Sequence, residues 1–550
     1  MTATVSDAGA GRPDPPESED GVLAAPKAAI FFLGALGGTQ AVDPIIASTA
    51  LVKASRGLGM EGGTIALAAS ISTVVLAATV ISMGLLGDRI GWRRLLISSL
   101  MVSVVGDLLA AAAPVSELYL AGRALAGLGL GGVFAASFAY VRIITPKEKV
   151  PAALGLYSAS GSLVLVTLSL LGGALASIEW RAAFLIVPVA CALYVLLARL
   201  LLPATARLTG GPTDLLGQVL LGFGIVGVLV GISHMSQGVG DPQFWLPTLA
   251  GAALLTGFVI AEQRVESPFF PVAVLRNPLF LGAMAAGFVY NFTQSSTVLQ
   301  FSNLWQYVSG LSPMKVSAGT LPFLLVGIIA ALLTGRLITN GLRNSTVILV
   351  GGFLCALGGF ATLLHRPGSG YLTLLPALLL LGFGATMASI PYGGLIVKAA
   401  SGKFSSFYGP VTSSRTTIGQ IAYAMGLALS TVMVDKLTTG GVVTRLREAG
   451  VPPSRTGTAL DSLGIYVRTG KDPVSRLAEQ TLSVAKESYL NSFQATMVAV
   501  GLLALLAALF GATVLHRGAA VEAAADTADT ADTADTADTA DTPTVEWAGE

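Results

Sequence analysis

The sequence predicts an all-α integral membrane protein with fourteen transmembrane helices, and three observations support this fold class. Hydrophobic residues make up 53% of the chain and charged residues only 11%, whereas soluble domains average about 25% charged residues. The mean hydropathy is +0.74. Apolar residues gather in segments of membrane-spanning length, and basic residues gather in alternate connections. We therefore expect a lipid bilayer to surround most of this chain.

The individual spans follow from the length of helix that a bilayer requires. Roughly 20 apolar residues cross about 30 Å of hydrocarbon as a helix, because lipid offers no partner for backbone polar groups. The predicted spans are 27–51, 62–86, 94–113, 117–144, 152–177, 181–203, 213–236, 244–264, 278–302, 313–335, 345–364, 371–398, 405–434 and 490–514.

Both ends of the chain read as disordered segments. Residues 1–26 hold five acids among prolines, unlike a secretory signal with its basic start and short apolar core. We predict a disordered cytosolic leader. Residues 515–550 carry an acidic repeat of Ala-Asp-Thr, which predicts a disordered, solvated tail.

Basic residues predict the orientation of the spans. With a cytosolic N-terminus, the inner connections hold Arg89, Arg93, Arg94, Arg142, Lys147, Lys149, Arg199, Arg207, Arg264, Arg276, Arg336, Arg343, Lys398 and Lys403. The short outer connections hold mainly Lys53, Arg56, Arg181, Lys315 and Arg366. Because basic residues favour the cytosolic side, we predict a multi-pass protein of the plasma membrane with both termini in the cytosol. The long hydrophilic connection 436–489 then lies outside the cell.

Cysteines and histidines argue against several classes of protein. Cys191 and Cys355 fall inside distant predicted spans, which argues against a disulfide framework or a metal site. The three histidines are scattered, and the sequence has neither a His-Glu-x-x-His motif nor a phosphate-binding glycine-rich loop. We expect no cofactor, no metal, no nucleic-acid partner and no enzymatic activity, and we expect a monomer.

The stretch GLLGDRIGWRR, residues 84–94, lies in the predicted cytosolic turn between the second and third spans. Two interpretations of its charges are open. Its three bases could serve only to keep the loop in the cytosol; these are Arg89, Arg93 and Arg94. Asp88 does not serve that purpose and needs a basic or helix-terminal partner. Gly84 and Gly91 would permit a tight turn and close backbone approach.

This string closely resembles the signature loop of the major facilitator superfamily. The resemblance implies that the acid and the bases form a cytoplasmic gate, which holds the two halves of the molecule together when the inner side is closed. LAGRALAGLGLGG at 120–132 resembles the fourth-helix motif of that family. Other stretches resemble its fourteen-helix drug:proton antiporters: VDPIIASTALV at 42–52, WRAAFLIVP at 180–188, ESPFFPVAVLRNPLF at 266–280 and YVSGLSPMKVSAGTLPFLL at 307–325.

The resemblance implies a major facilitator fold of two six-helix bundles. The bundles would comprise residues 27–203 and 278–514, with a two-helix insert and cytosolic linker at 204–277. Alternating access would come from one bundle rocking against the other around a midplane site. The fifth helix departs from the antiporter pattern, since LSLLGG at 168–173 has Ser169 where the subfamily has proline.

Three charged residues lie within predicted spans, where an ionisable group is costly and is usually functional or paired. Counted from the outer boundary at 1.5 Å per residue, Asp43, Asp107 and Arg123 lie at one level, roughly 9–12 Å deep. They could be a neutralised pair that only joins helices. Alternatively they could couple transport to protons, with Asp43, beside the helix-interrupting Pro44, as the proton carrier, Arg123 as its modulator and Asp107 as the weaker candidate.

The second half offers polar residues without acids inside its spans. Two groups occur at one-turn spacings, on the ninth and thirteenth predicted helices: Tyr290, Asn291 and Gln294, and Arg415, Gln420 and Tyr423. They could form interhelical hydrogen bonds or line a substrate cavity. In a cavity, their donors and aromatic faces would suit a bulky, partly apolar molecule.

The sequence thus favours a secondary transporter that exports a hydrophobic or drug-like small molecule in exchange for protons. A lipid or glycolipid flippase, or an uptake carrier of the same fold, is the nearest alternative. A non-transporting membrane sensor or enzyme is disfavoured by the missing catalytic set of residues. The expected partners are the substrate, protons and the lipid bilayer.

Overall fold

The computed structural model describes residues 26–61, 63–146, 149–205, 214–235, 240–265, 268, 270–400, 404, 408–448 and 476–538. All regular elements within these residues are helical. The first half contains α1 (Pro26–Leu58), α2 (Gly63–Ile90), α3 (Trp92–Ala112), α4 (Ser116–Ile143), α5 (Val150–Ile178), α6 (Trp180–Ala183) and α7 (Ile186–Leu201). Next come α8 (Leu215–His234), α9 (Pro242–Glu262) and the short 3-10 helix η3 (Val272–Arg276).

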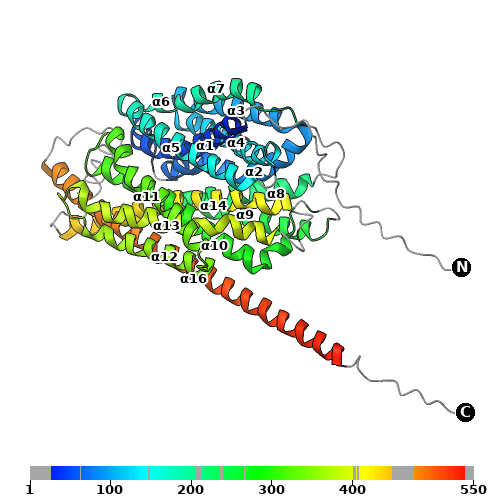
Figure 1. Ribbon diagram of the computed structural model, residues 1–550. Coiled ribbons are helices and arrows are strands. Elements are labelled where there is room, and N and C mark those ends of the chain that lie inside the picture. The colour runs from blue at the N-terminus through cyan, green and yellow to red at the C-terminus, as the bar shows by residue number, and fades with distance from the viewer. Residues whose placement is uncertain are drawn as a thin grey trace, which may run out of the picture.

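The second half is built from six long helices and two short ones. It contains α10 (Pro278–Tyr307), α11 (Pro313–Thr339), α12 (Asn344–Ala361), η4 (Thr362–Leu364), η5 (Tyr371–Leu374), α13 (Leu375–Ala399), α14 (Tyr408–Glu448) and α16 (Arg476–Asp538). We refer to α1–α7 as the N half and to α10–α16 as the C half. In Figure 1 the two halves lie one above the other.

The fourteen predicted spans all correspond to helices of the described chain, with α6 and α7 together forming the sixth. Thirteen of these helical segments are long and apolar enough to cross a membrane. The fourteenth, α10, falls short because glutamines, asparagines, serines and threonines replace apolar residues along it. Most of its side chains are nevertheless buried, so other helices, rather than lipid, surround them.

The two halves repeat the same packing pattern, which identifies them as two equivalent six-helix bundles. In the N half, α1 packs on α5, α2 on α4, and α3 on both α4 and α7. In the C half, α10 packs on α14, α11 on α13, and α12 on both α13 and α16. Between the halves, α2 meets α14 and α5 meets α11. Each of these contacts joins the second helix of one bundle to the fifth of the other, as a two-fold relation requires.

The two inserted helices form a hairpin at the side of this pair of bundles. α8 packs against α9 and also touches α2 and α14, one helix from each half. Aspartates cap both helices, because Asp214 accepts a hydrogen bond from Gly217 N at 2.8 Å and Asp241 one from Gln243 N at 2.7 Å. The insert therefore lies beside the interface between the two halves.

Two features of the helices differ from the sequence prediction. Pro44 does not interrupt α1, which runs unbroken from Pro26 to Leu58. The predicted loop 436–489 is helical at both ends, where α14 continues to Glu448 and α16 begins at Arg476. The Arg445–Glu487 ion pair at 2.6 Å joins the two extensions. Hydropathy did not predict these helical extensions because their residues are polar. Residues 449–475, between them, lie outside the described residues.

The C-terminal tail also differs from its prediction. α16 continues to Asp538, through most of the acidic repeat, and Figure 1 shows this last part extending away from the bundles. Alanine, the best helix former, fills every third position of the repeat, which lets the helix continue past the membrane span. The predicted leader, apart from Pro26, lies outside the described residues.

Candidate functional site

A buried charged cluster joins three helices of the N half. Arg123 on α4 donates from Nη1 and Nη2 to the two carboxylate oxygens of Asp43 on α1, both at 2.7 Å. Its Nη1 also donates to Asp107 Oδ1 on α3 at 2.8 Å. The exposed fractions are 3% for Asp43, 0% for Asp107 and 1% for Arg123. The three residues that the sequence places at one depth are therefore in direct contact.

The surroundings of the cluster include groups that the sequence did not single out. Ser72 on α2 donates to Asp43 Oδ2 at 3.0 Å. Phe184 lies 5.2 Å from the Arg123 guanidinium and packs edge-on against Trp180 and Tyr119. Ser72 lies nine residues into α2, a depth similar to that of the three charges, and this position was the available signal.

Close helix packing holds Ser72 against the cluster. A Cβ atom added to Gly127 on α4 would lie 2.1 Å from the Ser72 carbonyl oxygen, so α2 and α4 touch here through backbone alone. Only glycine permits this approach. The fourth-helix glycine thus sets the distance between the Asp43 carboxylate and its serine donor.

Two atoms of the cluster have no hydrogen-bond partner. Asp107 Oδ2 and Arg123 Nε are both buried and unsatisfied among the described residues. Asp43 accepts three hydrogen bonds, whereas Asp107 accepts one. Asp43 is therefore the more extensively hydrogen-bonded of the two carboxylates.

The predicted gate loop turns at Gly91, whose φ of 89° is a left-handed value that suits glycine. Trp92 N donates to Thr205 Oγ1 at 2.8 Å, and Arg93 Nη1 donates to the Leu202 carbonyl at 3.3 Å. These contacts tie the loop to the segment that follows α7, within the N half. Asp88 is half-buried, and Arg89 and Arg94 are exposed.

The prediction that Gly84 permits the tight turn and a close approach is wrong. Gly84 lies inside α2 rather than in the turn, and nothing lies within 4 Å of an added Cβ. The glycine that allows close approach is Gly87, where the Trp92 ring would lie 2.6 Å from such a Cβ. Residues 84–90 of the loop string form about the last two turns of α2, so this helix continues beyond the predicted end of the span at residue 86.

The six predicted cavity residues lie where α10 and α14 meet. Tyr290 lies beside Gln294 and within electrostatic range of Arg415, and the Arg415 guanidinium lies 5.0 Å from the Tyr392 ring. Asn291 donates to the Gly287 carbonyl at 2.8 Å and lies against Gly419. Gln420 is half-buried on α14. α10 and α14 thus contribute a polar seam to the centre of the molecule.

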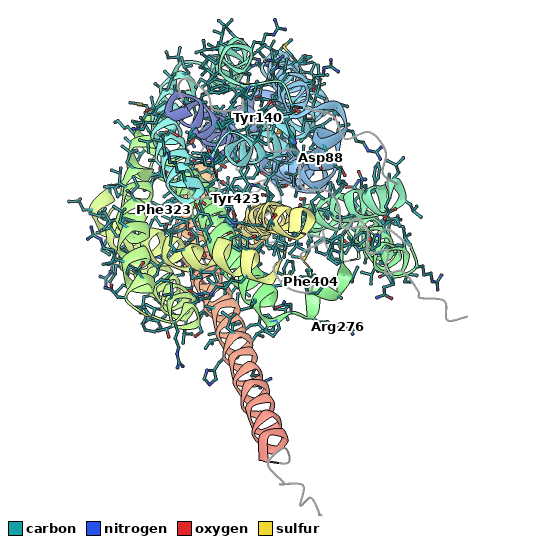
Figure 2. The ribbon with its side chains drawn as sticks, turned by 45° about the vertical axis from the view of Figure 1, so that its right-hand side comes forward. Asp88, Tyr140, Arg276, Phe323, Phe404 and Tyr423 are labelled. Carbon is teal, nitrogen blue, oxygen red and sulfur yellow. The ribbon has the colours of Figure 1, made fainter. Side chains whose placement is uncertain are left out.

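Tyr423 connects this seam with the N half. It is 6% exposed and packs in one hydrophobic cluster with α1 residues that include Ile46. Its hydroxyl has no hydrogen-bond partner and lies within electrostatic range of both Tyr290 and Asp43. Figure 2 shows Tyr423 between the two halves.

Three hydrogen bonds between described residues of the two halves lie at one end of the molecule, which holds the α1–α2 and α10–α11 turns. Ser302 donates to the Ser48 carbonyl at 3.2 Å and Gln306 to the Thr49 carbonyl at 3.0 Å. Met314 N donates to Ser177 Oγ at 2.8 Å. We call this the predicted outer end; its hydrogen bonds hold the halves together there.

Family comparison adds the decisive observation. The family model described as Major Facilitator Superfamily matches residues 29–427, which cover α1 to α14 and include both halves of the seam. The chain belongs to the major facilitator superfamily. It is therefore a multi-pass membrane transporter of small molecules, and the gate loop and the buried cluster are parts of a transporter.

Sequence relatives are transport and resistance proteins. The chain is 26% identical over 448 residues to the multidrug efflux pump LfrA of Mycolicibacterium smegmatis, covering 80% of this chain and 86% of the relative. It is 26% identical over 481 residues to the methyl viologen resistance protein SmvA of Salmonella typhimurium, covering 85% and 94%. It is 27% identical over 428 residues to the puromycin resistance protein pur8 of Streptomyces alboniger, covering 76% and 82%.

Solved structures share the fold. A bacterial homologue of the human lysosomal transporter Spinster, in an inward-facing and occupied conformation, superimposes with a TM-score of 0.61 at 14% identity, covering 89% of this chain and 96% of that one. A peptide transporter POT in complex with sulfate superimposes with a TM-score of 0.56 at 15% identity, covering 89% and 95%. The two-bundle fold of a major facilitator is therefore established for this chain.

Proposed function

We propose that this transporter exports a hydrophobic or drug-like small molecule in exchange for protons, with Asp43 as the proton carrier. The observation that carries the proposal is the buried Asp43–Arg123–Asp107 cluster. The names of the relatives LfrA, SmvA and pur8, which denote efflux and resistance, support export as the direction of transport.

Charge arithmetic gives the cluster its capacity to bind a proton. One guanidinium and two carboxylates carry a net charge of −1 when all three are ionised. Burying an uncompensated charge costs several kcal/mol. While the cluster is shielded from water, the form with one bound proton, which is neutral, is therefore the more stable one. Release of that proton becomes favourable when water or a substrate reaches the cluster. Proton release and substrate entry are thereby linked.

Asp43 is the better proton carrier because of the helix on which it lies. α1 packs against α10 and α11 as well as against the N half, so a movement between the halves changes its surroundings. The principal neighbours of α3, which holds Asp107, all belong to the N half. In this proposal Asp107 is the fixed acid that keeps Arg123 paired when Asp43 is protonated.

Tyr423 lies near both the charged cluster around Asp43 and the polar seam of α10 and α14. Its hydroxyl has no hydrogen-bond partner among the described residues and lies within electrostatic range of both Tyr290 and Asp43. A substrate bound at the seam would reach Asp43 past this side chain. The seam supplies aromatic faces and amide groups for an apolar substrate with few polar atoms.

The test uses purified protein in proteoliposomes with an imposed pH gradient. Methyl viologen and puromycin, named by the relatives, serve as first substrates. Asp43→Asn preserves size and hydrogen bonding but removes titration, so uphill accumulation should vanish while substrate binding persists. Glu117→Gln, an exposed acid in the first turn of α4, is the matched control and should behave like the wild type.

Two outcomes would contradict the proposal. If Asp43→Asn still accumulates substrate against a gradient, the coupled proton is carried elsewhere, and Asp107→Asn becomes the next variant. If neither variant nor the wild type responds to the pH gradient while labelled lipid is transferred, the protein is a flippase of the same fold.

A further inference from the structure

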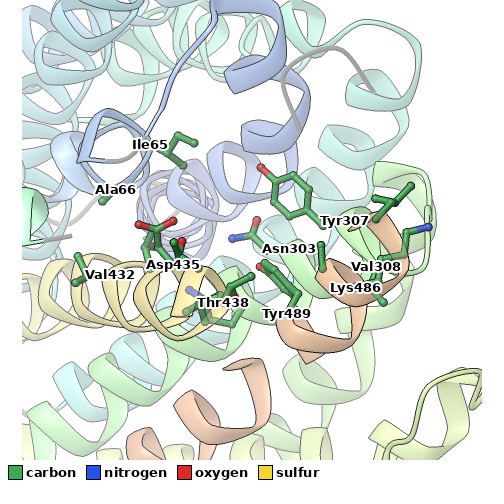
Figure 3. Close-up of a pocket in the computed structure, with 16 residues that line it drawn as sticks. Ile65, Ala66, Asn303, Tyr307, Val308, Val432, Asp435, Thr438, Lys486 and Tyr489 are labelled. Atoms are coloured by element: carbon green, nitrogen blue, oxygen red, sulfur yellow. The ribbon is translucent and has the colours of Figure 1, made fainter. Parts of the chain in front are cut away.

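A cavity of ≈ 220 Å³ lies at the predicted outer end, between the two halves. Ile65 and Ala66 of α2 line one side, and residues of α10, α14 and α16 line the other (Figure 3). None of the six predicted cavity residues lines it. It is therefore distinct from the central seam, and the outer ends of three C-half helices build it.

The polar atoms left unsatisfied in this cavity include buried amide oxygens. Gln300 is 0% exposed, and its amide nitrogen donates to Ser430 Oγ at 2.9 Å, which leaves Oε1 without a partner. Asn303 is 6% exposed, and its Oδ1 is also unsatisfied. A buried polar group without a hydrogen bond is unfavourable. These two oxygens are acceptors, so the missing group is a hydrogen-bond donor or a cation.

Aromatic rings supply a second feature that favours a cation. The Tyr307 and Tyr489 rings both line the cavity, with centroids 5.8 Å apart and an interplanar angle of 50°. The Arg56 guanidinium already lies 5.7 Å from the centroid of Tyr307. Aromatic faces attract cations through the negative potential above the ring. Tyr489 can offer such a face to a ligand.

The charges of the lining are separated. Asp435 and Lys486 lie toward opposite ends of the cavity (Figure 3). The carboxylate lies at the end where Val432 and Ala66 provide apolar walls. A molecule with a cationic group and an apolar body would therefore place its charge near Asp435 and Tyr489, away from the lysine.

We propose that this cavity is a second ligand site, specific for a small organic cation or for the cationic end of a larger substrate. Its ≈ 220 Å³ falls below the ~300–1,000 Å³ of sites for drug-sized ligands, so it holds one ring system with its charged group. The proposal rests on the proposed export function, in which this site would receive the substrate after it leaves the central seam. Binding here requires no proton gradient.

The experiment measures binding of benzyltrimethylammonium to the full-length protein in detergent by isothermal titration calorimetry, without a pH gradient. Phenylmethanesulfonate, with the same ring and a negative charge, is the matched probe. Asp435→Asn should weaken binding of the cation about fivefold, a modest effect because Asp435 is exposed. Tyr489→Leu should weaken it about threefold or more. Lys486→Met should tighten it, which a general loss of folding cannot produce.

The control is Glu179→Gln, which removes an exposed acid at the same end of the molecule, and this variant should bind like the wild type. Equal affinity for cation and anion, or unchanged affinity in both Asp435→Asn and Tyr489→Leu, would overturn the site. Loss of cation binding in Gln294→Ala, a variant of the central seam, would place the ligand in that seam and also overturn the outer site. If only the proposed role of Asp43 in proton coupling is wrong, Asp43→Asn will still export substrate uphill. The binding of benzyltrimethylammonium to the outer cavity will then be unchanged.

Discussion

The two halves of this transporter bury polar groups of different kinds. The N half buries three ionised or ionisable side chains in one contact, Asp43, Asp107 and Arg123. Within the described residues, the C half buries amides and hydroxyls along α10 and α14, with no buried carboxylate. The two bundles therefore share one arrangement of six helices but differ in the polar groups that they bury. The N half holds buried carboxylates that can change their charge, whereas the seam of α10 and α14 holds neutral hydrogen-bonding groups beside Arg415.

This difference has a consequence for coupling. A change of protonation in the N half must affect ligand contacts in the C half across the interface between them. Three of the side chains at this interface contact α1: Tyr423 packs in one cluster with α1 residues, and Ser302 and Gln306 donate to the α1 backbone. Because α1 holds Asp43, it is one element through which the two interiors can influence each other.

The largest expected effect concerns the charge of the N half. Arg123→Gln leaves two buried carboxylates without a counter-charge and should destabilise the protein by ~3–5 kcal/mol. Gln300→Met in the C half removes one neutral hydrogen bond and should cost about 1 kcal/mol. Thermal unfolding in detergent, followed by size-exclusion chromatography, compares the two variants.

A rescue variant separates folding from transport. Arg123→Gln combined with Asp43→Asn and Asp107→Asn makes the cluster neutral, so stability should largely return while proton-driven export remains absent. If Arg123→Gln lowers the stability of the protein no more than Gln300→Met does, the buried charges of the N half matter no more to folding than the buried amides of the C half. The contrast between the halves then fails.

The next effect concerns Asp88 in the loop between α2 and α3. Asp88→Asn should leave insertion and folding intact but lower the initial transport rate about tenfold, since a charge-assisted hydrogen bond contributes ~1.5–3 kcal/mol. The measurement is uptake into inverted membrane vesicles at matched protein levels. Arg199→Gln, which removes an exposed basic residue from the last turn of α7 and lies outside the gate loop, is the control and should transport like the wild type. Normal transport by Asp88→Asn would reduce the loop to a signal for membrane orientation.

A smaller effect separates two glycines of the N half. Gly127→Ala forces α4 away from the Ser72 carbonyl and should destabilise the protein by ~1–3 kcal/mol, as overpacking does. Gly84→Ala places a methyl group in open space within α2 and should be neutral, or stabilising by up to ~1 kcal/mol. A shared loss of stability in both variants would mean that helix flexibility, rather than close packing, explains these glycines.

Sequence patterns predicted the parts of the molecule that depend on hydrophobicity and depth. Fourteen spans follow from apolar length, and the contact of Asp43, Asp107 and Arg123 is consistent with equal depth. Contacts that depend on rotation about helix axes were missed, including Ser72 against Asp43 and Phe184 beneath the guanidinium. The outer cavity was missed because four separate helices contribute to it.

The freedom of a glycine backbone does not by itself indicate where a helix ends, so Gly84 was assigned to a turn that lies seven residues later, at Gly91. Likewise, Pro44 removes one backbone donor from α1 but does not break the helix, because neighbouring helices on all sides fix its course.

The smallest expected effect concerns the tail of the C half. Deleting 521–550 should leave transport unchanged, because an acidic repeat whose only apolar residue is alanine has no large apolar side chain to anchor it on the bundles. The helical form of the repeat up to Asp538 does not alter this expectation, since alanine alone supports a helix in that composition. Export by the truncated protein is measured in the same vesicles as export by the full chain, at equal expression. A second variant with the repeat aspartates changed to asparagine keeps the length and removes the charge. Loss of export in the truncation but not in the neutral variant would indicate that helix length matters, and loss in both would assign a regulatory role to the acidic charge.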